Sequence, residues 1–182
     1  MIETQQMISI DAAIDQVWGY VNDIRQWASL VPGCRDCAVI NAQDSRWTLK
    51  VGVGGLVRTV NVMVHVDAWD APQQVQFSYR LEGDPVVGSG SYVASRRAAQ
   101  ATDVTLMVRV EGSGPMSPLW EAMSRPLLPQ LAKSFIVQLK TEIEKAAHAR
   151  AAQDGPVTDG RSGLRLLGRR LRELWRTLFG CA

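Results

Sequence analysis

Few side chains in this sequence are suited to act as an acid, a base or a nucleophile. The two histidines, His65 and His148, fall on the outward face of an expected strand and near the end of an expected helix. A nucleophilic triad needs an imidazole beside a nucleophile and an orienting carboxylate. Neither histidine position favours that arrangement, so we expect both to be surface residues and predict no catalytic residue.

The cysteines do not form a convincing metal site. Cys34 and Cys37 make one Cys-x-x-Cys pair, without a second pair or a histidine cluster at ligand spacing. We therefore expect them to pack as small apolar side chains, and we predict neither a metal nor a cofactor. With Cys181 they form an odd and sparse set, which is typical of a reducing compartment rather than of a disulfide scaffold.

The glycine-rich segment Gly52-Val53-Gly54-Gly55 resembles a phosphate-binding loop in composition. No Lys-Ser/Thr and no helix start follow it, so its backbone amides would not be presented to an anion. We interpret it as a hairpin turn. Arg58, which lies just beyond it, leaves room for an anionic head group.

The elements that position these residues can be assigned from hydrophobic periodicity. Residues 3–10 alternate as a strand, and two short helices follow, ending at Val31-Pro32-Gly33. Between Cys37 and Gly114 the period is two, with turn residues at regular intervals. From about Leu119 to Ala152 it returns to a helical spacing, and one side of that helix carries Leu128, Leu131, Phe135, Leu139, Ile143 and Ala146.

The order of elements is therefore one strand, two short helices, six strands and one long helix. This order predicts an α+β fold in which a curved seven-stranded antiparallel sheet wraps around the long C-terminal helix. Pro126 and Pro129 lie inside the first turns of that helix, where each removes a backbone donor and favours a kink.

Several short motifs resemble a known superfamily. The run Ile14-Asp15-Gln16-Val17-Trp18 and the segments Asn22-Asp23 and Val31-Pro32-Gly33-Cys34 are similar to the START/Bet v 1-like (SRPBCC) superfamily of helix-grip domains, over residues 1–150. The Val-Pro-Gly-Cys segment, the turn at 52–55 and Gly88-Ser89-Gly90-Ser91 resemble the carbon monoxide dehydrogenase G-subunit-like family within it.

The superfamily resemblance implies an apolar cavity between the sheet and the long helix. The strand and helix phases turn Phe77 and Tyr79 inward, facing Leu131 and Phe135. We expect the mouth to be closed by Trp27, Tyr92, Met123 and Leu127. The alternative is that these side chains simply fill a core. A buried tyrosine hydroxyl needs a partner, and a ligand carbonyl would serve as one.

The C-terminal part of the chain has a different character. Residues 151–163 are rich in Gly, Asp, Ala and Pro and are expected to form a flexible linker, and 164–180 fit a basic amphipathic helix. Residues 161–182 hold six arginines and one glutamate. One face of the predicted helix carries Leu164, Leu167, Leu171, Leu174, Trp175, Leu178 and Phe179, and the other carries Arg165, Arg169, Arg172 and Arg176. Such a helix suits the surface of an anionic membrane, and docking on a protein is the alternative. The folded domain lacks basic residues interleaved with aromatics, so we predict no nucleic-acid partner.

These features lead to a functional hypothesis. The chain shows neither an N-terminal leader pattern nor an apolar run long enough to span a bilayer, so we expect a cytoplasmic protein held peripherally at the inner face of the membrane. The resemblance implies a non-enzymatic domain that binds a quinone or lipid and recruits a molybdenum hydroxylase of the carbon monoxide dehydrogenase type. The alternatives are a polyketide cyclase or aromatase, and a pure protein adaptor with a filled cavity.

Overall fold

The computed structural model describes residues 1–53, 56–115 and 117–153. Along the chain the elements are β1 (Ile2–Ile10), α1 (Ile14–Val21), α2 (Ile24–Leu30), β2 (Cys34–Val39), β3 (Asp44–Val53), β4 (Leu56–Asp70), β5 (Gln74–Leu81), β6 (Val86–Ala98), β7 (Ala101–Gly112) and α3 (Ser117–Gln153). This order confirms the predicted α+β class. Residues Met1–His148 form one compact unit.

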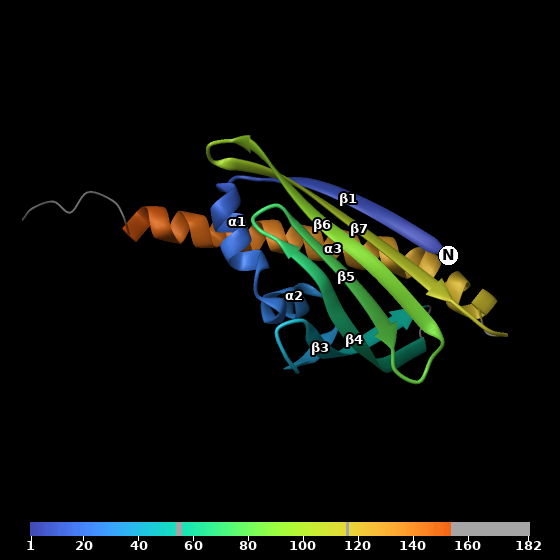
Figure 1. The fold of residues 1–182 in the computed structure, drawn as a ribbon. Helices are drawn as coiled ribbons and strands as arrows, with labels where there is room; N and C mark the ends of the chain where they lie inside the picture. Colours follow the sequence, from blue (N-terminus) through green and yellow to red (C-terminus); the bar gives the residue numbers. More distant parts are fainter. Residues whose placement is uncertain (54–55, 116, 154–182) are drawn as a thin grey trace, which may run out of the picture. The chain divides into compact units, whose positions relative to one another are not determined.

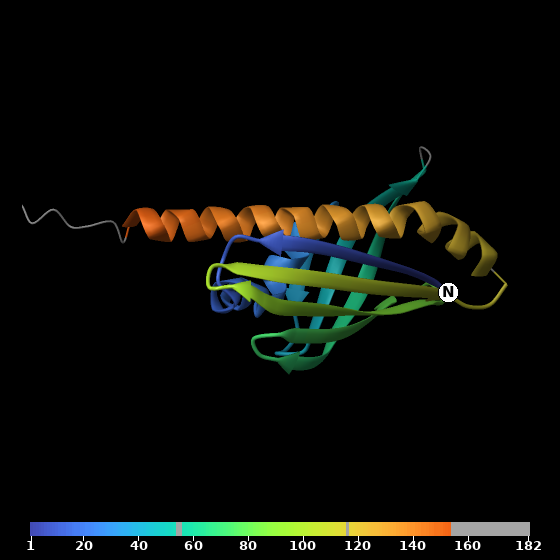
Figure 2. The same cartoon turned by 90° about the horizontal axis from the view of Figure 1, so that it is seen from above.

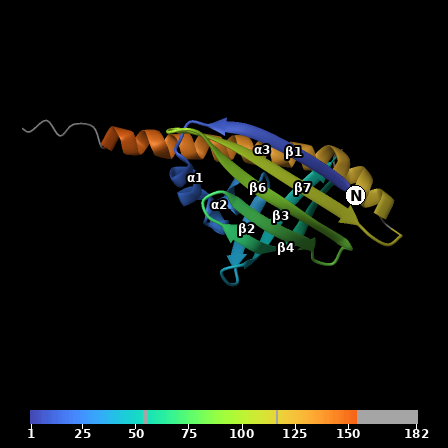
Figure 3. The same cartoon turned by 45° about the horizontal axis from the view of Figure 1, so that its top comes forward.

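The seven strands form a single antiparallel sheet in the order β1-β7-β6-β5-β4-β3-β2. Figures 1 and 3 show this sheet from two directions. Strands β2 to β7 pair with their neighbours in sequence, and β1 returns to pair with β7 along its whole length. The glycine run at 52–55 belongs to the predicted hairpin between β3 and β4, although 54–55 themselves lie outside the described residues.

The alternation read from the sequence separates the two faces of the sheet. On β4 the four valines Val60, Val62, Val64 and Val66 are buried, whereas His65 between them points outward. Because side chains alternate along a strand, this register places one apolar row of β4 in the core. The same row continues across the sheet through Val75 of β5 and Val104 and Leu106 of β7.

The helix α3 lies along the inner face of the sheet (Figure 2). Its core-facing side chains include Phe135, Leu139 and Ile143, as the periodicity predicts, and they join the same cluster as the sheet valines. Pro126 and Pro129 both lie inside the helix. Figure 2 shows its first turns running at an angle to the remainder, which is the kink expected where proline removes an intrahelical hydrogen bond.

The helix α3 continues to Gln153, into the first residues of the predicted linker at 151–163. The rest of that linker and the predicted amphipathic helix at 164–180 lie outside the described residues. No helix within the described ranges is long and apolar enough to cross a membrane.

Candidate functional site

A cavity of about 240 Å³ lies between the inner face of the sheet and α3. Its wall is formed by strands β3 to β7 on one side, by Ile24, Trp27 and Val31 at the α2 end, and by the first half of α3 on the other side. Nearly all lining side chains are aliphatic or aromatic. The space is therefore suited to an apolar molecule.

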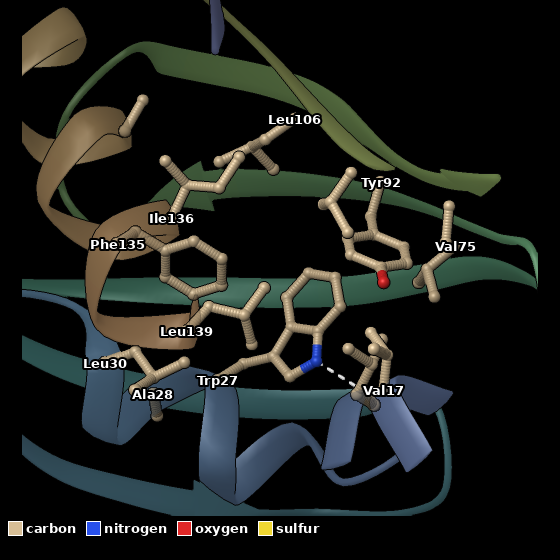
Figure 4. Close-up of a cluster of buried hydrophobic side chains, with 14 of the residues drawn as sticks. Val17, Trp27, Ala28, Leu30, Val75, Tyr92, Leu106, Phe135, Ile136 and Leu139 are labelled. Carbon is tan, nitrogen blue, oxygen red and sulfur yellow. Dashed lines mark hydrogen bonds between the residues drawn. The ribbon is translucent and has the colours of Figure 1, made fainter. Parts of the chain in front are cut away.

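Most of the predicted ligand-binding residues line this cavity. They are Trp27, Phe77, Tyr79, Met123, Leu127, Leu131 and Phe135. Tyr92 does not, and its predicted place at the mouth is wrong: its side chain is 1% exposed and packs in the core behind Trp27. Trp27 is also buried rather than at the mouth, because α2 presses it against the sheet (Figure 4).

Trp27 is the centre of an aromatic cluster at the inner end of the cavity. Its ring centroid lies 5.6 Å from that of Phe77, 5.7 Å from that of Phe135 and 6.0 Å from that of Tyr92. The indole nitrogen donates a hydrogen bond to the Val21 carbonyl oxygen at 2.5 Å, so the one polar group of this side chain is satisfied locally. The Phe77 ring stands nearly perpendicular to the Trp27 ring, and the Tyr92 and Phe135 rings are tilted against it. Aromatic rings favour such edge-on and tilted contacts. They fix the inner wall of the cavity.

Two glycines of β6 make room for the aromatic residues of β5. In the antiparallel register Phe77 pairs with Gly90 and Tyr79 pairs with Gly88. A side chain at either glycine would overlap the ring opposite it. The rings therefore lie over bare backbone, an arrangement known to compensate for glycine in sheets.

The two tyrosines predicted to bind the ligand, Tyr79 in the cavity wall and Tyr92 in the core, differ in their polar contacts. The Tyr79 hydroxyl reaches across β6 and donates to the Arg109 carbonyl oxygen at 2.7 Å. The buried Tyr92 hydroxyl has no hydrogen-bond partner among the described residues. Burial raises the pKa of both hydroxyls above the ordinary value for tyrosine.

The only charged side chain among the described residues that line the cavity is Arg58. It lies at the open end, where its guanidinium faces the ring of Trp120 in the first turns of α3. Sequence reasoning missed Trp120, although it precedes Met123 and Leu127 at helical spacing. The ion-pair partner of Arg58, Asp84, could not be found from the sequence, because it belongs to the turn between β5 and β6.

The other polar candidates lie away from the cavity. The His65 Nδ1 is 2.7 Å from Asp44 Oδ1 on the outer face of the sheet, and His148 Nδ1 is 2.6 Å from the Glu144 carbonyl oxygen. Burial raises the pKa of the Cys34 and Cys37 thiols. Across the described ranges, no group of three or more His, Cys, Asp or Glu side chains is arranged to hold a metal ion.

The family of the chain is shown by its sequence. Residues 1–144 match the model of a family described as polyketide cyclase / dehydrase and lipid transport. The chain belongs to this family. Membership confirms the START-like (SRPBCC) prediction at the superfamily level. The narrower resemblance to the carbon monoxide dehydrogenase G-subunit-like family stays a prediction.

Solved structures show the same fold at low sequence identity. A conserved protein from Geobacillus kaustophilus is 18% identical, with a TM-score of 0.70 over 80% of this chain and 97% of its own. A START superfamily protein from Mycobacterium smegmatis is 13% identical, with a TM-score of 0.60 over 79% and 98%. An aromatase/cyclase from a Streptomyces species is 18% identical, with a TM-score of 0.56 over 86% and 99%. No curated protein sequence matches the chain. At these identities the structural likeness extends to the helix-grip fold and not to a particular reaction.

Proposed function

We propose that this member of the family is a non-catalytic carrier that holds a lipophilic small molecule between its sheet and α3. The observation that supports this most strongly is the cavity itself, whose 240 Å³ are bounded almost entirely by apolar side chains. An apolar cavity of about 150 Å³ is already large enough to bind benzene. A larger ligand, such as a quinone ring or part of a lipid chain, would gain more from leaving water.

The composition of the wall favours binding over catalysis. None of the described lining residues is an aspartate, a glutamate or a histidine. Cyclisation and dehydration of a polyketide require proton transfers, for which these are the usual groups. The Tyr79 hydroxyl has a raised pKa and its proton is already donated to a backbone carbonyl, which makes it a poor proton donor. A cyclase activity, as carried by the Streptomyces relative, is therefore the alternative.

Solvent extraction of the purified full-length protein, followed by mass spectrometry, tests the carrier function. An apolar molecule recovered in constant proportion to the protein, and lost from a variant with a blocked cavity, is the expected result. Repeated recovery of nothing but protein, together with failure to bind a neutral lipophilic dye, would leave the filled-core adaptor as the better description.

The proposal extends to the location of the protein. The one-sided arginines and the Trp175 and Phe179 rings of the C-terminal segment support a tether to an anionic membrane surface on the cytoplasmic side. The Gly88-Ser89-Gly90-Ser91 motif supports service to a molybdenum hydroxylase of the carbon monoxide dehydrogenase type, for which a membrane-derived quinone would be a suitable cargo.

Liposome co-sedimentation of the full chain and of a version ending at Gly160 tests the tether. Only the full chain should pellet, on anionic vesicles and less so as salt rises, because arginine attraction to lipid phosphate is screened by ions. Equal behaviour of the two proteins would exclude the tether. Replacing Trp175 and Phe179 by alanine then distinguishes an anchor from a docking helix. Loss of pelleting indicates an anchor, whereas unchanged pelleting with loss of hydroxylase binding indicates docking on that protein.

A further inference from the structure

Among the described residues that line the cavity, Arg58 is the one with a charged side chain. It belongs to the first residues of β4 and lines the cavity beside Trp120 and Ser124 of α3. Its guanidinium carbon lies 5.7 Å from the centroid of the Trp120 ring, within the range of a cation–π contact. The side chain is 52% exposed, so the guanidinium meets both solvent and the mouth of the cavity.

Asp84 holds this guanidinium from a third element, the turn between β5 and β6. Its Oδ2 is 2.9 Å from Arg58 Nη2, and its side chain is only 14% exposed. The contact is an ion pair without hydrogen-bond alignment. Among the described residues no acceptor is hydrogen-bonded to the Arg58 guanidinium. A guanidinium has five N–H donors in a plane, so it can receive a further oxygen acceptor.

The deeper part of the cavity offers no comparable polar group among the described residues. The Tyr79 hydroxyl donates to the Arg109 carbonyl oxygen, and the Trp27 nitrogen donates to the Val21 carbonyl oxygen. A ligand with one polar end would therefore place it at Arg58 and its apolar body toward Trp27. Burying that end among the aliphatic residues instead would leave it without a hydrogen bond.

We propose that the ligand is a single-chain amphiphile whose carboxylate binds Arg58 at the mouth, in competition with Asp84. This inference rests on the proposed carrier function and narrows its ligand to the lipid alternative, because a quinone has no carboxylate. A carboxylate matches the planar donor fork of an arginine. A phosphate monoester carries nearly two negative charges at neutral pH and would meet one cation that Asp84 already neutralises in part, so it fits less well.

Displacement of the neutral dye Nile red from the full-length protein tests this assignment. The competing ligands are decanoate, decanol and decyl phosphate at neutral pH, and the proteins are the wild type, Arg58→Gln and Asp84→Asn. Arg46→Gln is the matched control, because Arg46 forms a similar surface ion pair with Glu82 at 2.6 Å and does not line the cavity.

Arg58→Gln should weaken decanoate binding about tenfold, and Asp84→Asn should strengthen it about threefold, because one removes the charge partner and the other removes its competitor. Decanol binding should change little in either variant, and Arg46→Gln should behave as wild type. Thermal melts of the variants check that the fold is intact.

The possible outcomes distinguish a failure of the carboxylate assignment from a failure of the proposed carrier function. If Nile red and decanol bind but decanoate affinity ignores both substitutions, the carrier function stands and the carboxylate assignment is wrong. If decyl phosphate binds more tightly than decanoate with the same dependence on Arg58, the head group is a phosphate and the assignment is again wrong. If no probe binds the wild-type protein, the carrier function fails and this inference fails with it.

Discussion

At Gly90, the absence of a side chain decides how the inner wall of the sheet is built. An added Cβ would overlap the Phe77 ring and approach the Met107 carbonyl oxygen to 2.7 Å. The ring can move only by disturbing Trp27, against which it packs, and the carbonyl belongs to the sheet backbone. The small residue is thus a packing requirement of the aromatic cluster.

Gly90→Ala should lower the free energy of unfolding by about 1–3 kcal/mol, the usual cost of overpacking a core. Urea denaturation measures this change. Gly19→Ala is the matched control, since Gly19 lies in α1 and an added Cβ there meets nothing within 4 Å. It should stabilise the protein by about 0.5–1 kcal/mol through helix propensity. Equal effects of the two substitutions would contradict the packing role of Gly90.

The two tyrosine hydroxyls allow a paired experiment. Tyr92→Phe removes a buried hydroxyl that has no partner among the described residues, so stability should stay the same or rise by up to about 1 kcal/mol. Tyr79→Phe removes the hydrogen bond to the Arg109 carbonyl and should cost about 1 kcal/mol. Urea denaturation of both variants measures these changes in the free energy of unfolding. A marked loss of stability in Tyr92→Phe would mean that its hydroxyl has a hydrogen-bonding role after all.

At the scale of elements, the bend in α3 brings its first turns to the mouth of the cavity. Pro126 and Pro129 lie inside the helix, between Trp120 and Met123 on one side and Leu131 on the other. Trp120 and Met123 are both part of the cavity wall. In a straight helix, Trp120 and Met123 would continue in line with the rest of α3 and would not lie over the mouth of the cavity.

Replacing Pro126 and Pro129 together by alanine should raise the melting temperature, because backbone donors return to the helix and each interior proline costs about 3 kcal/mol. The same variant should bind Nile red more weakly, because the cavity wall is displaced. Pro118→Ala is the control: Pro118 lies in the first turn, where its missing donor is not needed. Unchanged Nile red affinity in the double variant would show that the bend does not shape the cavity.

The period-two runs, the helical stripes and the order of elements were enough to predict the sheet, α3 and the inward phase of Phe77 and Tyr79. The alternation of side chains predicts which face of the sheet a residue lies on, but it does not predict how far along the sheet the residue lies. Tyr92 also faces inward, yet it pairs with Val75 and is buried in the core instead of lying at the mouth. The meeting of Arg58, Asp84 and Trp120 depends on three elements distant in sequence, which no local pattern encodes.

At the scale of the whole molecule, a ligand carrier must leave space that an ordinary core would fill. Interiors are normally packed to the density of organic crystals, and an empty apolar cavity forgoes contact energy. The walls of this cavity are held by features independent of any ligand: the aromatic cluster around Trp27, the glycines of β6 and the kinked start of α3. This supports a cavity built to receive a molecule.

The most direct test of the carrier function is a Nile red titration of the full-length wild type beside Val60→Phe and Val87→Phe. Val60 is buried in the cavity wall on β4, whereas Val87 of β6 is 54% exposed and does not line the cavity. The wild type and Val87→Phe should bind the dye alike, and Val60→Phe should lose at least about tenfold in affinity, because its ring occupies the ligand space. Equal binding by all three proteins would contradict a carrier function based on this cavity.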